Sequence, residues 1–385
     1  QHLRRLLLLR SMDAGAAVES RLRAGAVIGD TVAQAALAQQ MPGFDDQLDA
    51  HWAQVWAGAC QGEGVDVRQR LEAGYLLGEL GDTLRYERVT VHLSDGTRRT
   101  GLRLRDLHWA KLGVRGRKKQ WFRVGTDGGG NENEQPSYRI DFEPFQIARY
   151  PVTVGEWRWF VGGGGYASPD LPWWQTAGGA ACEWLQQYSR SPGGFLSNAV
   201  MMLRRSKRNN PLQPMCGQTA YEALAYTAWA AALAGEGARF EVPTEWRWEA
   251  AVRGPCSVQR SSQRAGWLHL TGVVEPSPFD FNHDRTRFER TSPVGCFGMG
   301  SAAHGVFDAA GNVREWCANG LDAANWAKVP RGALDFLALR GGSYDLAADN
   351  CRPATRDDSS PDDFARDLGV RLARLWLPHS ERQVS

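Results

Sequence analysis

The sequence lacks any apolar run that approaches the roughly 20 residues of a membrane-spanning helix. Its opening segment, QHLRRLLLLRS, is too short for a secretory signal peptide and has no small-residue cleavage site. Net charge is also nearly absent, because 45 Lys and Arg residues balance 43 Asp and Glu residues to leave a formal charge of +2. Such a chain has no global field to attract nucleic acid or an anionic membrane, so we expect a soluble protein with no nucleic-acid partner and no membrane partner.

Paired cysteines are absent as well. The seven cysteines are scattered, odd in number and free of any CxxC pair, which argues against a disulfide framework and against a zinc ribbon. A reducing, cytoplasmic location is therefore expected. The sequence also contains no Ser-His-Asp, P-loop or dinucleotide-binding signature.

Glycine and tryptophan are abundant instead, with 43 and 16 residues respectively. This combination predicts long irregular loops that are held by large aromatic side chains. The first 85 residues differ, because they are rich in Ala, Leu and Arg at helical spacing, and RLRAGAVIGD (Arg21 to Asp30) returns as RLEAGYLLGE (Arg70 to Glu79). The repeat predicts a small HEAT-like stack of helices over residues 1–85, and two similar amphipathic helices arising by chance are the alternative.

The pattern changes at Tyr86. RVTVHL and TGLRLRDL alternate apolar and polar residues around an Asp-Gly turn, which predicts a β-hairpin. Two amphipathic helices are expected over Val152 to Val161 and over Thr219 to Gly235, the second beginning with a Thr cap and Glu222. VPTEWRWEAA predicts a third helix capped by Thr244. We therefore predict a second, loop-rich α+β domain over residues 86–385.

Five ordered segments within this domain carry a family resemblance. They are RYPVTVGEWRWFV, NNPLQPMCGQTAYEALAYTAWAAAL, FEVPTEWRWEAAVRG, SPVGCFGMGSAAHGVFDAAGNVREWC, and LRGGSY followed by DLGVRLAR. Together they resemble the formylglycine-generating enzyme (sulfatase-modifying factor) domain, a variant of the C-type-lectin fold. The resemblance implies an irregular, loop-rich α+β fold preceded by the helical segment.

The catalytic residues of that family are incomplete here. Active members bind copper through two cysteines five residues apart, just after GGS[WY]; the second position matches Cys351, but the first is Leu346. Because Cu(I) needs at least two thiolates, we expect no copper. Iron-dependent relatives use an HxxxHxE cluster, and none of the eight histidines has this spacing. The sequence therefore predicts that the protein is not an enzyme.

The segment AAGNVREWC predicts a structural metal site. The resemblance implies that Asn312, a main-chain carbonyl such as that of Val313, and Glu315 hold a calcium ion, since hard cations prefer oxygen ligands. The alternative is that Asn312 and Glu315 bond only to backbone amides of the loop. Arg340 and Arg371 are placed in sequence to hold carboxylates or carbonyls around the loop that lies between them.

That loop, residues 341–371, resembles the cassette of variable proteins from diversity-generating retroelements, with GGSY, six residues, CR, a second run of residues and then LGVRL. The resemblance implies a non-catalytic protein that binds a protein ligand through a diversified loop. The alternatives are a formylglycine-generating-type oxidoreductase acting on a protein cysteine, and a fixed structural interaction module. Cys351, Arg352, Arg356 and Arg366 are expected to support the loop. The expected ligand-binding, solvent-facing positions are Asp345, Leu346, Ala347, Asp349, Asn350, Asp357, Asp358, Ser359, Asp362, Asp363 and Phe364.

Overall fold

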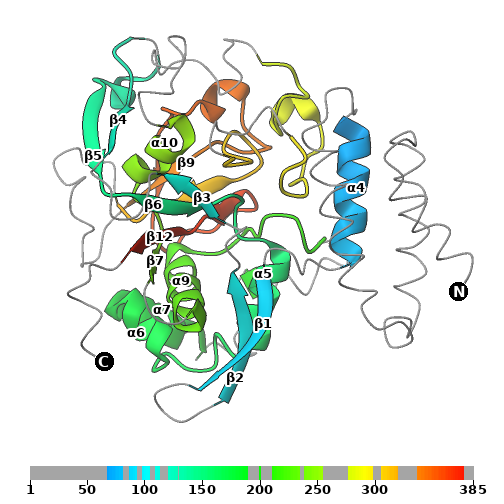
Figure 1. Ribbon diagram of the computed structural model, residues 1–385, viewed down its shortest axis with the longest axis vertical. Coiled ribbons are helices and arrows are strands. Elements are labelled where there is room, and N and C mark those ends of the chain that lie inside the picture. The colour runs from blue at the N-terminus through cyan, green and yellow to red at the C-terminus, as the bar shows by residue number, and fades with distance from the viewer. Residues whose placement is uncertain are drawn as a thin grey trace, which may run out of the picture.

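A computed structural model describes most of residues 86–385 and one helix that precedes them. The described residues are 67–80, 86–92, 98–104, 109–112, 120–128, 130–189, 199–200, 210–234, 238–254, 276–297, 305–319 and 336–376. Short helices and strands joined by irregular segments make up this part of the chain (Figure 1). The expectation of a loop-rich α+β fold is confirmed. The first copy of the repeat, residues 21–30, lies outside the described residues.

The helices are α4 (Val67–Leu80), α5 (Val154–Gly162), α6 (Pro172–Ala177), α7 (Gly179–Ser189), α9 (Ala220–Ala234) and α10 (Glu245–Arg253). Three of them begin at a threonine cap, which the sequence predicts for the helices at Thr219 and Thr244. The Thr153 and Thr219 side chains accept hydrogen bonds from the amides of Glu156 and Glu222, and each glutamate accepts one in return from its threonine amide. Thr244 accepts from the Arg247 amide at 3.3 Å.

The strands are β1 (Tyr86–His92), β2 (Arg98–Leu104), β3 (Trp109–Leu112), β4 (Gln120–Val124), β5 (Tyr138–Phe142), β6 (Phe145–Ala148), β7 (Ala238–Glu241), β8 (Arg314–Trp316), β9 (Leu337–Arg340), β10 (Asp357–Ser359), β11 (Leu368–Val370) and β12 (Ala373–Trp376). The predicted hairpin is β1 with β2, and a second hairpin pairs β4 with β5. One four-stranded sheet has the order β3-β6-β12-β7 and the other β10-β9-β8-β11.

Tryptophan dominates the core, as the composition predicts. The side chains of Trp109, Trp157, Trp174, Trp229 and Trp316 lie fully buried in one cluster beneath α5, α6 and α9. A second cluster contains Trp246 and Trp248 of α10 and packs beneath the β4–β5 hairpin. The 341–371 loop leaves this core at β9 and returns to it at β11, so both of its ends are fixed in one sheet.

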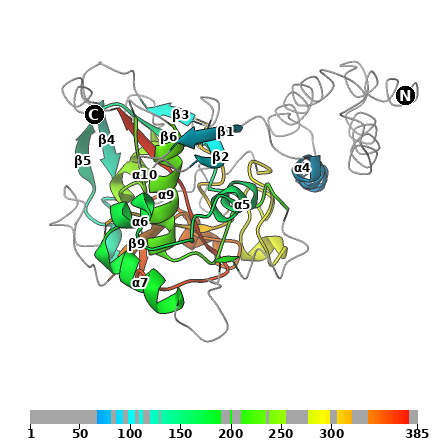
Figure 2. The same cartoon turned by 90° about the horizontal axis from the view of Figure 1, so that it is seen from below.

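Helix α4 packs on the part of the chain that follows it and lies beside residues 276–297 in both views (Figures 1 and 2). Val67 and Leu71 form a small buried cluster with Cys296 and Phe297. On the adjoining side of the helix, the Asn210 side-chain amide donates to the Tyr75 carbonyl at 2.6 Å. A Cβ at Gly78 would collide with Asn210, so the glycine of RLEAGYLLGE permits this close approach. Among the described helices, none is long and apolar enough to cross a membrane.

Candidate functional site

The predicted ligand-binding positions lie on the outside of the 341–371 loop. Nine of them are exposed, while Leu346 and Ser359 are partly buried. A short 3-10 helix, Ala348–Cys351, and strand β10 give the loop regular structure. Asp357 and Asp358 project from β10, which is an edge strand of its sheet. The loop therefore presents mainly short acidic side chains to solvent.

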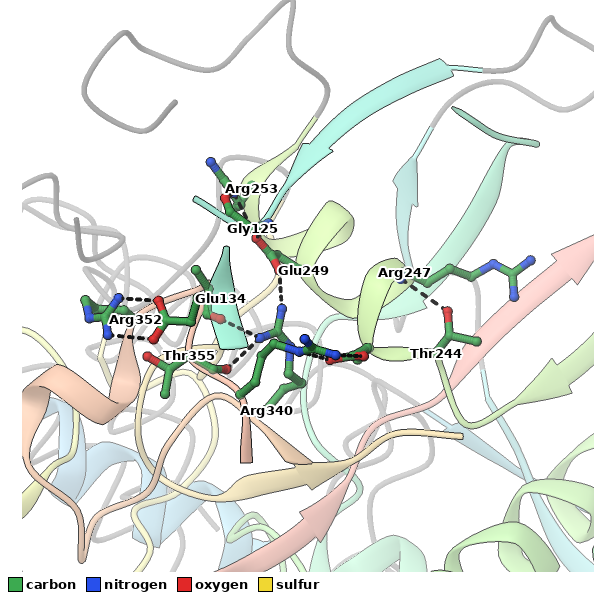
Figure 3. Close-up of polar contacts among 12 residues, drawn as sticks. Gly125, Glu134, Thr244, Arg247, Glu249, Arg253, Arg340, Arg352 and Thr355 are labelled. Atoms are coloured by element: carbon green, nitrogen blue, oxygen red, sulfur yellow. Dashed lines mark hydrogen bonds and ion pairs between the residues drawn. The ribbon is translucent and has the colours of Figure 1, made fainter. Parts of the chain in front are cut away.

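Arg340 directly precedes the loop, and its side chain lies completely buried on the inner side of the loop (Figure 3). Its guanidinium group forms an ion pair with Glu249 of α10 and donates to the carbonyls of Ala354 and Thr355 at 2.9 and 2.6 Å. Glu249 also accepts from Arg253 at 2.8 Å. One buried carboxylate thus joins α10, β9 and the middle of the loop.

Arg352 and Arg356 anchor the same loop to two other glutamates. Arg352 donates from both terminal nitrogens to Glu134, at 2.7 and 2.9 Å (Figure 3). Arg356 binds Glu245 through its Nε and Nη2 atoms at 2.8 and 2.5 Å, and its guanidinium group lies over the Trp246 ring. Both glutamate side chains are fully buried, so these pairs hold the loop from beneath.

The Glu134 contact brings in residues 126–137, which connect β4 to β5. The sequence predicts only a surface loop there, and most of the segment is indeed exposed. Glu134, however, is 2% exposed. A Cβ at Gly130 would collide with the Glu134 carboxylate, so glycine at this position permits the buried pair. The Asn133 carbonyl accepts a second bond from Arg356 at 2.7 Å. Residues 126–137 and the 341–371 loop are therefore bound together.

Arg366 differs from the prediction that it supports the loop. Its side chain is 66% exposed and pairs only with Asp345, which is also exposed, at 2.9 Å. An ion pair in such a position contributes little to stability because water competes for both charges. The expectation of a fixed, buried Arg366 is wrong. Cys351 by contrast is completely buried, and burial raises the pKa of its thiol to about 12.

A pocket of about 210 Å³ opens between these two segments. It is lined by residues of β8, β9, the segment 126–137 and the 341–371 loop. Among its lining residues are Asn131, Arg314, Arg340, Leu346, Asn350 and Asp357. Three arginines, Arg314, Arg340 and Arg356, line the pocket, and the Glu249 and Glu245 carboxylates that pair with Arg340 and Arg356 are buried.

The two positions that the family resemblance gives to copper do not fit that ion. Leu346 supplies no ligand atom, and the Cys351 thiol lies within hydrogen-bonding distance of the main-chain carbonyls of Ser343 and Ala347 at 3.9 and 3.8 Å. A buried thiol with a raised pKa is held in its protonated form, which is a poor metal ligand. Within the described residues, no three His, Cys, Asp or Glu side chains gather closely enough to hold a metal.

The residues predicted for calcium lie in a different place and have protein partners. Both Glu315 oxygens pair with Arg371, and one also accepts from the Trp248 indole at 2.6 Å. The Asn312 side chain bonds the Ser292 amide at 2.9 Å. Asn312 thus bonds a backbone amide, as the alternative interpretation expects, whereas Glu315 binds the side chain of Arg371. Calcium at Asn312, Val313 and Glu315 stays a prediction, and it would require Arg371 to move.

Arg371 organises this second network. It donates to the carbonyls of Ala148, Arg149 and Phe307 at 3.1, 2.8 and 2.9 Å, so it holds carbonyl groups as predicted, but these groups lie outside the 341–371 loop. Nearby, Asp308 is buried and accepts from the Gly295 amide at 2.6 Å. Burial raises the pKa of Asp308 to about 6, although the Gly295 hydrogen bond and the charge of Arg371 act in the opposite direction. The sequence contained no pattern that marked Asp308.

Comparison with known proteins identifies the family of this domain. The model of the sulfatase-modifying factor enzyme 1-like domain matches residues 119–375. Hercynine oxygenase from Mycolicibacterium thermoresistibile is 32% identical over 63% of this chain and 53% of its own length. Formylglycine-generating enzyme from Thermomonospora curvata is 26% identical over 66% of this chain and 90% of its own. The chain spans about half the length of the hercynine oxygenases that it matches.

Among solved structures, Treponema denticola variable protein 1 aligns with a TM-score of 0.42 and 16% identity, over 74% of this chain and 98% of that protein. This likeness is too low to assign a function. The oxygenase relatives correct one expectation from the sequence: that the chain is not an enzyme. The missing cysteine bears on one kind of chemistry, copper-dependent oxidation. It does not remove catalysis from a family whose members also include oxygenases.

Proposed function

Because the chain belongs to the family of sulfatase-modifying factor enzyme 1-like domains, we propose that it binds a ligand in the pocket beneath the 341–371 loop, and that the exposed side chains of the loop determine which ligand is bound. The observation that carries the proposal is the pocket itself. It contains Leu346, the position that the family resemblance gives to a catalytic cysteine, and Asp357 and Asn350 of the predicted ligand-binding set.

The construction of the loop supports a recognition role. Buried arginine–glutamate pairs fix its inner side, whereas nine of the eleven predicted ligand-binding positions are exposed to solvent. A rigid scaffold can then change its outer side chains without changing its shape, as paratope loops do on an immunoglobulin sandwich. We propose a protein or peptide as the partner, because several exposed positions of the predicted set, among them Asp358, Asp362 and Asp363, lie outside the pocket lining.

Selection from random peptides displayed on phage tests this proposal. The protein should enrich a common peptide motif. The variant Leu346→Trp, which places a larger side chain in the pocket lining, should not enrich this motif. Thr176→Trp places the same side chain on the exposed end of α6 and serves as the matched control, which should enrich the same motif as the wild type. The proposal is wrong if no motif is enriched, or if Leu346→Trp retains the motif while both variants keep the wild-type melting temperature.

A further inference from the structure

Arg314 of β8 has two carboxylate partners that differ in their environment. Its Nε and Nη2 atoms donate to the two oxygens of Asp367 at 3.0 and 2.9 Å, and the Asp367 side chain is 7% exposed. Its Nη1 atom donates to Asp357 at 2.9 Å, and the Asp357 side chain is 51% exposed. The Asp367 carboxylate thus binds the single charge of the arginine from within, and the more exposed Asp357 carboxylate is a second partner that lines the pocket.

The two partners also differ in how firmly they hold the arginine. The bidentate pair with Asp367 is partly buried, with the Asp367 side chain the more enclosed of the two, and is reinforced by the Ser343 hydroxyl, which donates to the same carboxylate at 2.8 Å. The contact with Asp357 is single and faces water, and exposed pairs of this kind contribute about 0 to 1 kcal/mol. An incoming group can therefore replace Asp357 on Arg314 at little cost, while Asp367 keeps the guanidinium in place.

We propose that the pocket binds a carboxylate group of its ligand on the outer edge of Arg314, where Asp357 occupies the position of that group in the free protein. This inference rests on the proposed function and names the ligand chemistry of the same pocket. Guanidinium N–H groups suit a planar carboxylate, and the Asn131 and Asn350 amides at the rim can bond the rest of the ligand.

The acidic surface around the pocket opposes an anion but does not outweigh the direct contact. Asp358, Asp362 and Asp363 are exposed, and among the described residues none of them forms an ion pair. Their repulsion acts through water and is screened over about 8 Å at physiological ionic strength. A carboxylate at hydrogen-bonding distance from Arg314 gains a direct charge-assisted bond, so the surface selects against anions that do not reach the pocket.

Matched small probes test the inference by isothermal titration. N-acetylglycine carries a carboxylate, and N-acetylglycinamide has nearly the same shape without the charge. The acid should bind and the amide should not. Asp357→Asn removes the internal competitor and should tighten binding of the acid by up to about fivefold, the equivalent of a surface ion pair. Asp141→Asn makes the same change of charge on an exposed residue of β5, outside the loop and the pocket lining, and should change affinity by less than about twofold, because it can act only through the screened field.

Two further probes distinguish the source of the carboxylate. Glutarate represents a free organic acid, and N-acetyl-triglycine represents the carboxyl end of a peptide; the tighter of the two identifies the source, and either result supports the inference. Equal binding of acid and amide, weaker binding to Asp357→Asn, or no binding of any acid overturns it. Such results would not contradict the proposed function, because loss of a selected peptide motif in Leu346→Trp would still locate the binding site in the pocket.

Discussion

Replacing Arg352 tests how the 341–371 loop is held. The variant Arg352→Met keeps much of the aliphatic side chain but leaves the Glu134 carboxylate without its bidentate partner in a position where that side chain is fully buried. Removing one member of a buried ion pair costs about 3 to 5 kcal/mol, because the remaining charge is desolvated and unpaired. Arg352 itself is 10% exposed at the side chain, so some water can reach the vacated space, and we expect about 3 kcal/mol.

Arg366→Met is the matched control, because it makes the same substitution in the same loop at an ion pair that is exposed on both sides. Its cost should be below about 1 kcal/mol. Urea denaturation followed by tryptophan fluorescence measures both variants. The double variant Glu134→Gln with Arg352→Met should recover most of the loss, since it removes the stranded charge. Equal, small effects of the two arginine variants would refute the conclusion that buried pairs hold the loop.

Two other predictions concern buried titratable groups. The pKa of Asp308 is raised from its usual 3.8 to about 6, so the protonated side chain favours the folded state. Its contribution to the free energy of unfolding is complete below its usual pKa and is lost as the pH rises through about 6, a change of about 3 kcal/mol. The variant Asp308→Asn should lack this fall in stability with pH, and an unchanged slope would contradict the raised pKa. Wild-type protein should not compete with a chromophoric chelator for Cu(I) at Cys351, whereas Leu346→Cys, which restores the second thiol, should compete; copper uptake by the wild type would disprove the interpretation of Leu346.

Local features of the fold were predictable from the sequence. The caps at Thr153, Thr219 and Thr244 depend on residues three positions apart, so the pattern that starts each helix is complete within the sequence. The β1–β2 hairpin is likewise set by its turn and by alternation of apolar residues. The five segments that carry the family resemblance, taken in their order along the chain, were enough to indicate the family.

Contacts between distant segments were not predictable in the same way. Arg352 and Glu134 are 218 residues apart, and nothing in GGGNENEQ marks one of its two central glutamates as buried. Arg352 and Arg366 have no sequence feature that distinguishes their roles, yet Arg352 pairs with a buried carboxylate and Arg366 pairs with an exposed one. The role of Asp357 as a partner of Arg314 also depends on the register of β10, which only the folded sheet determines.

Simultaneous substitution of the exposed loop positions tests most directly the claim that the loop separates recognition from stability. The substituted residues are Asp349, Asn350, Asp358, Asp362 and Asp363, each replaced by Ser or Thr. Each surface change should alter the free energy of unfolding by no more than about 0.5 kcal/mol, so the melting temperature should stay close to that of the wild type, and the peptide motif enriched by phage display should change. An unfolded variant, or a stable variant that enriches the wild-type motif, would contradict the account.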